Sequence, residues 1–296
     1  MALIFRAIDA VARIFAAFGD GERQDMTGDL AGGERIFVQA IRRYCTDHGI
    51  AVDVRAGGWL IAMRRGQKRR FAFGYDIGLN SAIAHRLAND KSATAEVLRL
   101  ELVPCIPHQL FLNPKLGSNV VGAGWREAML ELLGDNPQGV VVKPNEGTSG
   151  RSVFKVATEA ELDRAANEVF SMSTGLVITP YVAIEDEVRV VLLDDVPRVV
   201  YSKRRGTDWR HNLDAGARPM LLEDGDVRTA CVKLAVDAAR AIGIVFASID
   251  VVRVDGAWRV LEINSGVMME ALAKLHPELV QATYDAALDR VFEPEH

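Results

Sequence analysis

The 296-residue chain has only three cysteines, no surplus of positive charge and no Walker-type phosphate loop. Cys45, Cys105 and Cys231 are far apart and lack CxxC spacing, which predicts reduced thiols, a cytoplasmic protein and no zinc site. The formal net charge of −5 argues against a general nucleic-acid binder. No GxxxxGK(S/T) spacing occurs, so a phosphate site would have to be built differently. Hydrophobic residues make up 49 % and charged residues 25 %, the balance of a globular chain with room for two or three packed lobes.

The segment Met1 to Phe18 is apolar enough to suggest a signal peptide, but Arg6, Asp9 and Arg13 interrupt it. Its apolar residues recur at helical spacing and are Leu3, Ile4, Ala7, Ile8, Val11, Ile14, Phe15 and Phe18. The pattern predicts an amphipathic helix packed on the protein or on a partner subunit, and we expect a homo-oligomer. A membrane-surface helix is the alternative, which the lack of a lysine cluster disfavours. No membrane span is predicted.

The one basic run, Arg64 to Arg70, lies between two apolar runs. It is interpreted as a hairpin tip whose charges discourage aggregation of the strand edges, with a polyanion site as the alternative.

The stretch Gly139 to Val156 predicts two strands joined by a polar, glycine-rich loop. Lys143 puts a positive charge at the edge of that loop, while Gly147 and Gly150 allow tight turns that expose backbone N–H groups. Further polar groups come from Glu146, Thr148 and Ser149. Such a hairpin tip can cradle a polyphosphate, whereas an ordinary glycine turn with a solvated lysine is the alternative.

Around this hairpin the sequence predicts a small α+β lobe from about residue 90 to residue 175. Asn89 to Phe111 runs as a helix into a strand, and Lys91 at its start could reach a nucleotide in a cleft. Thr158 and Glu161 form a capping box for a further helix. The lobe could close as a lid over bound nucleotide.

The strand Leu176 to Val182 and the acidic turn after it could offer backbone groups to an adenine edge, and Glu187 could accept from ribose hydroxyls. A hairpin about Asp194 and Asp195 is followed by a run of cationic residues, the cationic string, which suggests an anion site or, alternatively, a basic loop. The polar members of that string are Lys203, Arg204, Arg205, Asp208, Trp209, Arg210 and Asn212.

The segment Val245 to Gly266 predicts a strand hairpin that carries Asp250, Glu262 and Asn264. With a two-residue turn Asp250 and Glu262 would point to opposite faces, so we expect a three-residue loop, Asp255 to Ala257, that sets them directly across from each other. Two carboxylates and an amide oxygen on one apolar-flanked face are oxygen ligands of the kind that Mg²⁺ selects.

Taken in order, these pieces resemble the ATP-grasp superfamily, and specifically the RimK-type ligases, from about Asn89 to about Gly266. The resembling motifs are Asp90–Lys91, the KPNEGTSG loop that begins with Lys143, Glu187 before Arg189, the segment from Asp208 to Leu213, and the set Asp250, Glu262 and Asn264.

The resemblance implies an α+β fold of two lobes clasping ATP, preceded by a small N-terminal α/β domain. We expect an N-terminal part at 1–88, a lid lobe at 89–178 and a C-terminal lobe at 179–296. ATP would be held by Lys91, Lys143, Glu146, Gly147, Thr148, Ser149, Gly150, Pro180, Tyr181, Val182 and Glu187. Mg²⁺, or Mn²⁺, would be held by Asp250, Glu262 and Asn264, and the catalytic residues would be Lys203, Arg210 and Asn212.

The implied activity is ATP-dependent formation of an amide or peptide bond through an acyl phosphate, with release of ADP and phosphate. One substrate would be an amino acid, and the other a peptide, a carrier or a protein terminus. A phosphotransferase and a non-catalytic ATP-binding interaction protein remain as alternatives. The chain departs from the family pattern at Thr179 and Pro180, at Ser265 and Gly266, and in the region before Lys91.

Overall fold

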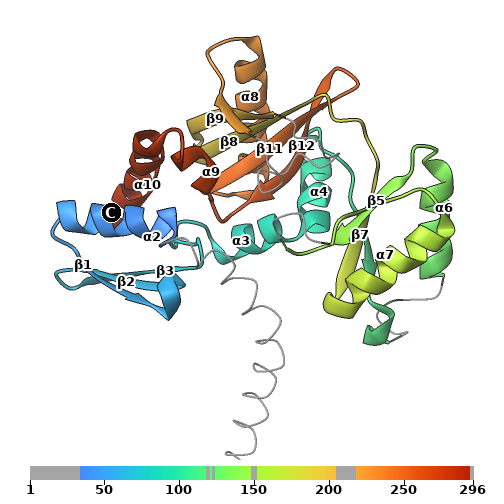
Figure 1. Ribbon diagram of the computed structural model, residues 1–296, viewed down its shortest axis with the longest axis horizontal. Helices are drawn as coiled ribbons and strands as arrows, with labels where there is room; N and C mark the ends of the chain where they lie inside the picture. Colours follow the sequence, from blue (N-terminus) through green and yellow to red (C-terminus); the bar gives the residue numbers. More distant parts are fainter. Residues whose placement is uncertain (1–33, 118–120, 122–123, 148–151, 205–217, 294–296) are drawn as a thin grey trace, which may run out of the picture.

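The computed structural model describes residues 34–117, 121, 124–147, 152–204 and 218–293. These residues form three parts, each with its own antiparallel sheet (Figure 1). The predicted helix from Met1 to Phe18 lies outside the described residues. No helix in the described ranges is both long and apolar enough to cross a bilayer.

The N-terminal part is one helix on a three-stranded sheet of order β1-β2-β3. Its elements are α2 (Ile36–Asp47), β1 (Ala51–Arg55), the 3-10 turn η1 (Ala56–Gly58), β2 (Leu60–Arg65) and β3 (Lys68–Phe73). Alternate strand residues such as Ile61 and Met63 are buried in one cluster with the inner side of α2. That cluster also includes residues of the C-terminal helix α10 (Pro277–Phe292), so this part shares its core with the C-terminal lobe (Figure 1).

The basic run forms the predicted hairpin tip between β2 and β3. Three of its cations donate hydrogen bonds to main-chain carbonyl groups at the end of α10: Arg65 to Phe292, Lys68 to Glu293 and Arg70 to Val291. Because the last carbonyls of a helix have no partners within the helix, these cations stabilise its C-terminus.

The lid lobe has a four-stranded sheet of order β4-β7-β5-β6. Its elements are β4 (Gln109–Leu112), η2 (Pro114–Leu116), α6 (Trp125–Asp135), β5 (Val140–Pro144), β6 (Phe154–Val156), α7 (Glu159–Met172) and β7 (Gly175–Pro180). The predicted capping box of Thr158 and Glu161 starts α7. One face of the sheet is buried with α6 and α7 in a cluster whose buried members all lie between residues 111 and 178.

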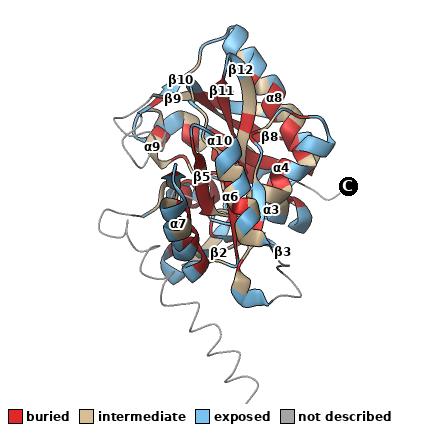
Figure 2. Cartoon of the chain, turned by 90° about the vertical axis from the view of Figure 1, so that its right-hand side faces the viewer, coloured by how far each residue is buried: buried red, intermediate tan, exposed pale blue. Residues whose placement is uncertain are grey.

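The C-terminal lobe has a five-stranded sheet of order β10-β9-β8-β11-β12. Its strands are β8 (Asp186–Leu193), β9 (Val196–Arg204), β10 (Arg218–Leu221), β11 (Phe246–Val254) and β12 (Ala257–Asn264), and its helices are α8 (Asp226–Ile242), α9 (Glu270–Ala273) and α10. Gly243 ends α8 in a left-handed conformation, as glycine commonly does at this position. Figure 2 shows the buried residues concentrated in the strands and the exposed ones on the outer faces of the helices.

Two helices of the connecting region, α3 (Ala82–Asn89) and α4 (Lys91–Leu100), pack on the C-terminal lobe. Ala84 and Leu98 are buried in the same cluster as residues of α8, β11 and β12. The expected boundary after residue 88 assigned α4 to the lid lobe, whereas its apolar face belongs to the C-terminal core. The domain division itself stays a prediction.

The hairpin of β11 and β12 confirms that Asp250 lies directly across from Glu262, but the expected three-residue loop is wrong. Val254 pairs with Ala257, so the turn contains only Asp255 and Gly256. The register shifts between Asp250 and Val251, where Leu261 is an extra residue on β12. A bulge of this kind reverses the alternation once, and it brings the two carboxylates back to one face.

Candidate active site

A row of charged residues crosses the C-terminal sheet. On neighbouring strands, Arg189 of β8 lies opposite Asp250 of β11, which lies opposite Glu262 of β12. Residues that lie directly opposite share a face of the sheet, so the three side chains point to the same side. Asn264 follows two residues after Glu262, and its Nδ2 donates to Glu262 Oε1 at 3.4 Å.

Asp250 is buried and bound by two cations. Arg189 grips it with two hydrogen bonds, Nε to Oδ1 at 2.7 Å and Nη2 to Oδ2 at 2.6 Å. Lys203 Nζ lies 2.9 Å from Asp250 Oδ2 and also donates to Glu187. Two cations therefore face two carboxylates in the interior, which is the pairing that buried charges require.

The electrostatics of this network follow from burial and pairing. Burial alone would raise the pKa of Asp250, but the charges of Arg189 and Lys203 outweigh it and hold the pKa below its usual range. Burial raises the pKa of Glu187 to about 7, although Lys203 opposes the shift. Asp250 is therefore ionised at neutral pH.

A second set of polar residues lies on the lid sheet. Lys143 of β5 lies opposite Val177 of β7, and Val177 lies opposite Leu110 of β4. Val141, two residues before Lys143 on β5, lies opposite Thr179 of β7. These side chains share one face, while the intervening residues, such as Val142 and Ile178, belong to the lobe's core on the other face.

Lys143 is buried, and among the described residues its ammonium group has no hydrogen-bond partner. Burial lowers its pKa to about 8; the carboxylate of Glu262 raises the pKa and the charge of Lys91 lowers it further. A buried cation without a partner is costly, so this position fits an anionic ligand.

Lys91 starts α4 and reaches the lid loop. Its Nζ donates to the carbonyl groups of Gly147 at 2.7 Å and Asn145 at 3.4 Å. The Asn145 side chain in turn accepts from the backbone N–H of Ser92 at 3.0 Å. Burial lowers the pKa of Lys91, while Glu262, Asp90 and Glu146 oppose the shift. The start of α4 thus holds the loop that follows β5.

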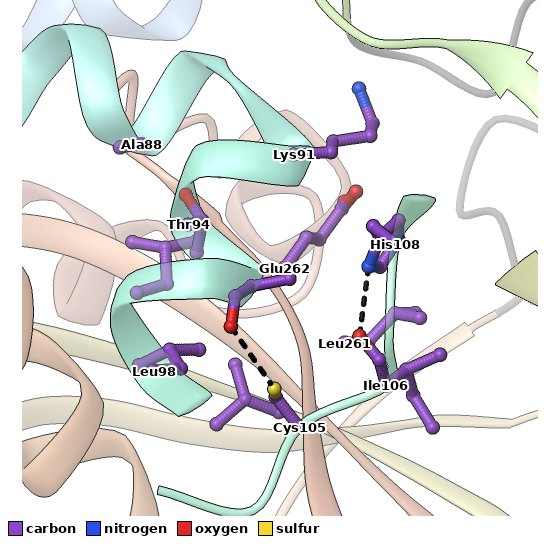
Figure 3. A pocket seen from close by; sticks show the side chains of 12 residues that line it. Ala88, Lys91, Thr94, Leu98, Cys105, Ile106, His108, Leu261 and Glu262 are labelled. Carbon is purple, nitrogen blue, oxygen red and sulfur yellow. Dashed lines mark hydrogen bonds between the residues drawn. The ribbon is translucent and has the colours of Figure 1, made fainter. Parts of the chain in front are cut away.

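Lys91, His108 and Glu262 line one pocket between α4, β12 and the segment that leads into β4 (Figure 3). The lower wall is apolar and includes Ile106 and Leu261. Both belong, with Val182, to a small hydrophobic cluster. The pocket therefore joins an apolar floor to a polar rim that carries one cation, Lys91, and one carboxylate, Glu262.

The structure places most predicted site residues around this region. Glu262, Asn264, Lys91, Lys143 and Gly147 lie as described above, and Pro180 ends β7 with Tyr181 and Val182 following it. Glu187, predicted to bind ribose, and Lys203, predicted as catalytic, lie in the interior, where Lys203 contacts both Glu187 and Asp250. Thr148, Ser149, Gly150, Arg210 and Asn212 lie outside the described residues, so their roles stay predictions.

Sequence reasoning missed three residues of the site. Arg189 was matched to the family without a role, although its position two residues after Glu187 on an alternating strand puts both on one face. Asn145 belongs to the matched loop but was given no role, and His108 carried no signal, because the contacts of both depend on the meeting of segments far apart in the chain.

The described donors fit a hard cation. Glu262, Asn264 and Asp250 present oxygens from one face of two paired strands. Asp250 Oδ1 accepts one hydrogen bond, from Arg189, so it keeps a lone pair for a metal ion. Oxygen ligands from few carboxylates are typical of Mg²⁺ sites that also use phosphate and water.

Comparisons with known proteins identify the family to which the chain is similar. The sequence model of the family described as "RimK-like ATP-grasp domain" matches residues 109–279. The tetrahydromethanopterin:alpha-L-glutamate ligase of Methanocaldococcus jannaschii is 25 % identical over 195 residues, which is 64 % of this chain and 62 % of that protein. The ribosomal protein bS6–L-glutamate ligase of Escherichia fergusonii is 22 % identical over 235 residues, 77 % of this chain and 72 % of that protein.

A solved structure shares the fold. The D-alanine–D-alanine ligase from Bacillus anthracis, complexed with ATP, superimposes with a TM-score of 0.54 at 21 % identity over 72 % of this chain and 67 % of that chain. The likeness confirms the predicted fold class. The match to the M. jannaschii relative spans less than two thirds of that protein's length.

Proposed function

The chain belongs to the RimK-like ATP-grasp family, and from this premise we propose that it is an ATP- and Mg²⁺-dependent carboxylate-amine ligase. A substrate carboxylate attacks the γ-phosphorus of ATP, and the bond to the β,γ-bridging oxygen breaks, giving an acyl phosphate and ADP. An amine then attacks the acyl carbon, phosphate leaves, and an amide or peptide bond remains.

The observation that carries the proposal is the pair of lysines beside Glu262. Lys143 supplies a buried positive charge that lacks a hydrogen-bond partner in the described part of the chain, and Lys91 adds a second from α4. Phosphoryl transfer needs positioning and neutralisation of phosphate charge, which two fixed ammonium groups supply. The glycine loop after Lys143, with Glu146 and Gly147, completes the phosphate side of the site.

Asp250, Glu262 and Asn264 would hold Mg²⁺, or Mn²⁺. When bound, the metal ion neutralises phosphate charge. Arg189 orients Asp250 by its two hydrogen bonds, and Lys203 helps to keep Asp250 ionised while it also pairs with Glu187. Arg210 and Asn212 would act on the transferred phosphate.

The substrates are proposed from the names of the two relatives, each of which is named an L-glutamate ligase. We assign an amino acid as the amine and a small molecule, peptide, carrier or protein terminus as the carboxylate. The protein would act in the cytoplasm as a homo-oligomer, without a nucleic-acid partner and without a membrane span.

The test is separation of ADP from AMP after incubation with ATP, Mg²⁺ and pools of amino acids and dipeptides. We expect ADP and an amide product in the wild type only with certain pools. Glu262→Gln should abolish both, because it removes a charged metal ligand, whereas the exposed Glu223→Gln should leave both unchanged. Release of AMP, a phosphorylated product without an amide, or wild-type turnover by Glu262→Gln would each contradict the assignment.

A further inference from the structure

Two buried polar atoms, one in the pocket and one on the face of the lid sheet that carries Lys143, lack hydrogen-bond partners in the described structure. They are Nε2 of His108 and Oγ1 of Thr179. A buried polar atom without a partner costs about 1–3 kcal/mol, so two such atoms near one ligand site require an explanation.

His108 Nε2 can only accept a hydrogen bond. Its Nδ1 lies 2.8 Å from the carbonyl oxygen of Ile106, so the ring proton is assigned to Nδ1 (Figure 3). Burial and the charges of Lys143 and Lys91 hold the pKa of His108 well below its ordinary value, which keeps the ring neutral. The lone pair of Nε2 is therefore left for a donor from outside.

Thr179 lies on the same face of the lid sheet as Lys143, because Val141 pairs with Thr179 and Lys143 follows Val141 by two residues. The next residue, Pro180, has neither a polar side chain nor a backbone N–H group. At the end of β7, the side-chain group that can form a hydrogen bond with a ligand is therefore the hydroxyl of Thr179.

The apolar floor locates the part of a nucleotide that would meet these atoms. Ile106 and Leu261 form a hydrophobic cluster with Val182, just past the end of β7, and a flat base would stack there. His108 lines the same pocket as Ile106, Leu261 and Lys91, and its ring is close enough to Lys143 and Lys91 for their charges to act on it.

We propose that His108 and Thr179 form the base-reading edge of the nucleotide site and select a purine that carries an exocyclic amino group. The amino group at position 6 of adenine donates to His108 Nε2, and the Thr179 hydroxyl donates to a ring nitrogen. A 6-oxo purine places an oxygen lone pair opposite the lone pair of Nε2. The two lone pairs repel each other, so the site binds the 6-oxo purine more weakly. The inference rests on the proposed nucleotide site and goes beyond it in naming how the base is chosen.

The experiment is calorimetric binding of ADP and of inosine diphosphate, which has a 6-oxo group in place of the amino group. We expect the wild type to bind ADP at least about tenfold more tightly, as one lost hydrogen bond with an unsatisfied partner implies. His108→Phe should reduce the preference for ADP over inosine diphosphate to less than about threefold, mainly by weakening the binding of ADP. His108→Asn should restore part of this preference, because the amide oxygen of asparagine can accept a hydrogen bond.

Thr179→Val gives a readout that a structural role would not produce. Removing a buried hydroxyl that has no partner among the described residues should leave the Tm of the free protein unchanged or raise it, while ADP binds about three- to tenfold more weakly. His85→Phe, at a histidine outside the pocket, is the matched control and should change neither nucleotide's affinity.

Three outcomes would overturn the inference. Equal wild-type affinity for the two nucleotides would exclude base selection altogether. An equal weakening of both nucleotides by His108→Phe would mean that His108 supports Lys143 instead of reading the base. If neither nucleotide binds to the wild type, the nucleotide site itself is refuted, and with it the proposed function.

Discussion

Lys143 makes nucleotide binding depend on pH in the alkaline range. With its pKa at about 8, the ammonium group is about 90 % charged at pH 7 and about 10 % charged at pH 9. If phosphate binds only the charged form, the affinity for a non-hydrolysable ATP analogue should fall about tenfold between these pH values. Lys143→Arg, which stays charged, should bind with little change over the same range.

Lys143 affects the stability of the free protein in the opposite direction: its contribution to the free energy of unfolding increases with pH. The pKa of Lys143 is lower in the folded chain than the ordinary 10.5 of the unfolded one, so between about pH 8 and pH 10.5 the unfolded state binds more protons. This lysine therefore makes the free protein more stable as pH rises through that window, whereas its contribution to nucleotide binding is lost.

The assay is titration calorimetry at pH 7, 8 and 9 with constant free Mg²⁺, repeated at pH 8.5 in two buffers of different ionisation enthalpy. Binding should take up most of one proton in the wild type and none in Lys143→Met, whose affinity should be low and independent of pH. An affinity that stays level to pH 9, or an equal decline in Lys143→Arg, would refute the reasoning.

Two further predictions concern stability. Arg65→Met removes the cation that binds the Phe292 carbonyl group and lies 4.9 Å from that ring, so chemical denaturation should show a loss of about 1–2 kcal/mol. The neighbouring Arg64→Met, on the exposed face, should cost less than about 0.5 kcal/mol, and equal losses would contradict the role in ending α10. Gly139→Ala would place a Cβ 2.4 Å from a backbone oxygen at a φ of +92°, so unfolding should become easier by more than about 1 kcal/mol. Gly134→Ala, in α6 with open space around it, should stabilise by up to about 1 kcal/mol, and the same sign at both glycines would be inconsistent with the clash.

Local signals predicted the elements of this fold well. The capping box at Thr158, the glycine after α8 and the alternating strands of β8 and β9 are each set by residues close together in the chain. The ordered family motifs then predicted the fold class, which no single element could do.

What the sequence did not predict depends on contacts between distant segments. The bulge at Leu261 has no glycine to mark it, so its presence follows only from the pairing of β11 with β12. Lys203 was predicted as a catalytic residue within the cationic string, and its contact with Glu187, which the pairing of β8 with β9 brings about, was not foreseen. The placement of α4 with the C-terminal core likewise depends on residues more than a hundred positions away.

The packing of α4 makes the C-terminal core discontinuous in the chain, with the lid inserted between α4 and β8. The buried residues of the lid cluster lie between residues 111 and 178, so the lid can fold as soon as this stretch leaves the ribosome. The core that holds Lys91 has to wait until β12, which ends at Asn264, has been synthesised. During translation the strands that flank the loop proposed to bind phosphate can therefore form before the two strands that would hold the metal, and the nascent chain cannot complete the site until β12 has been made.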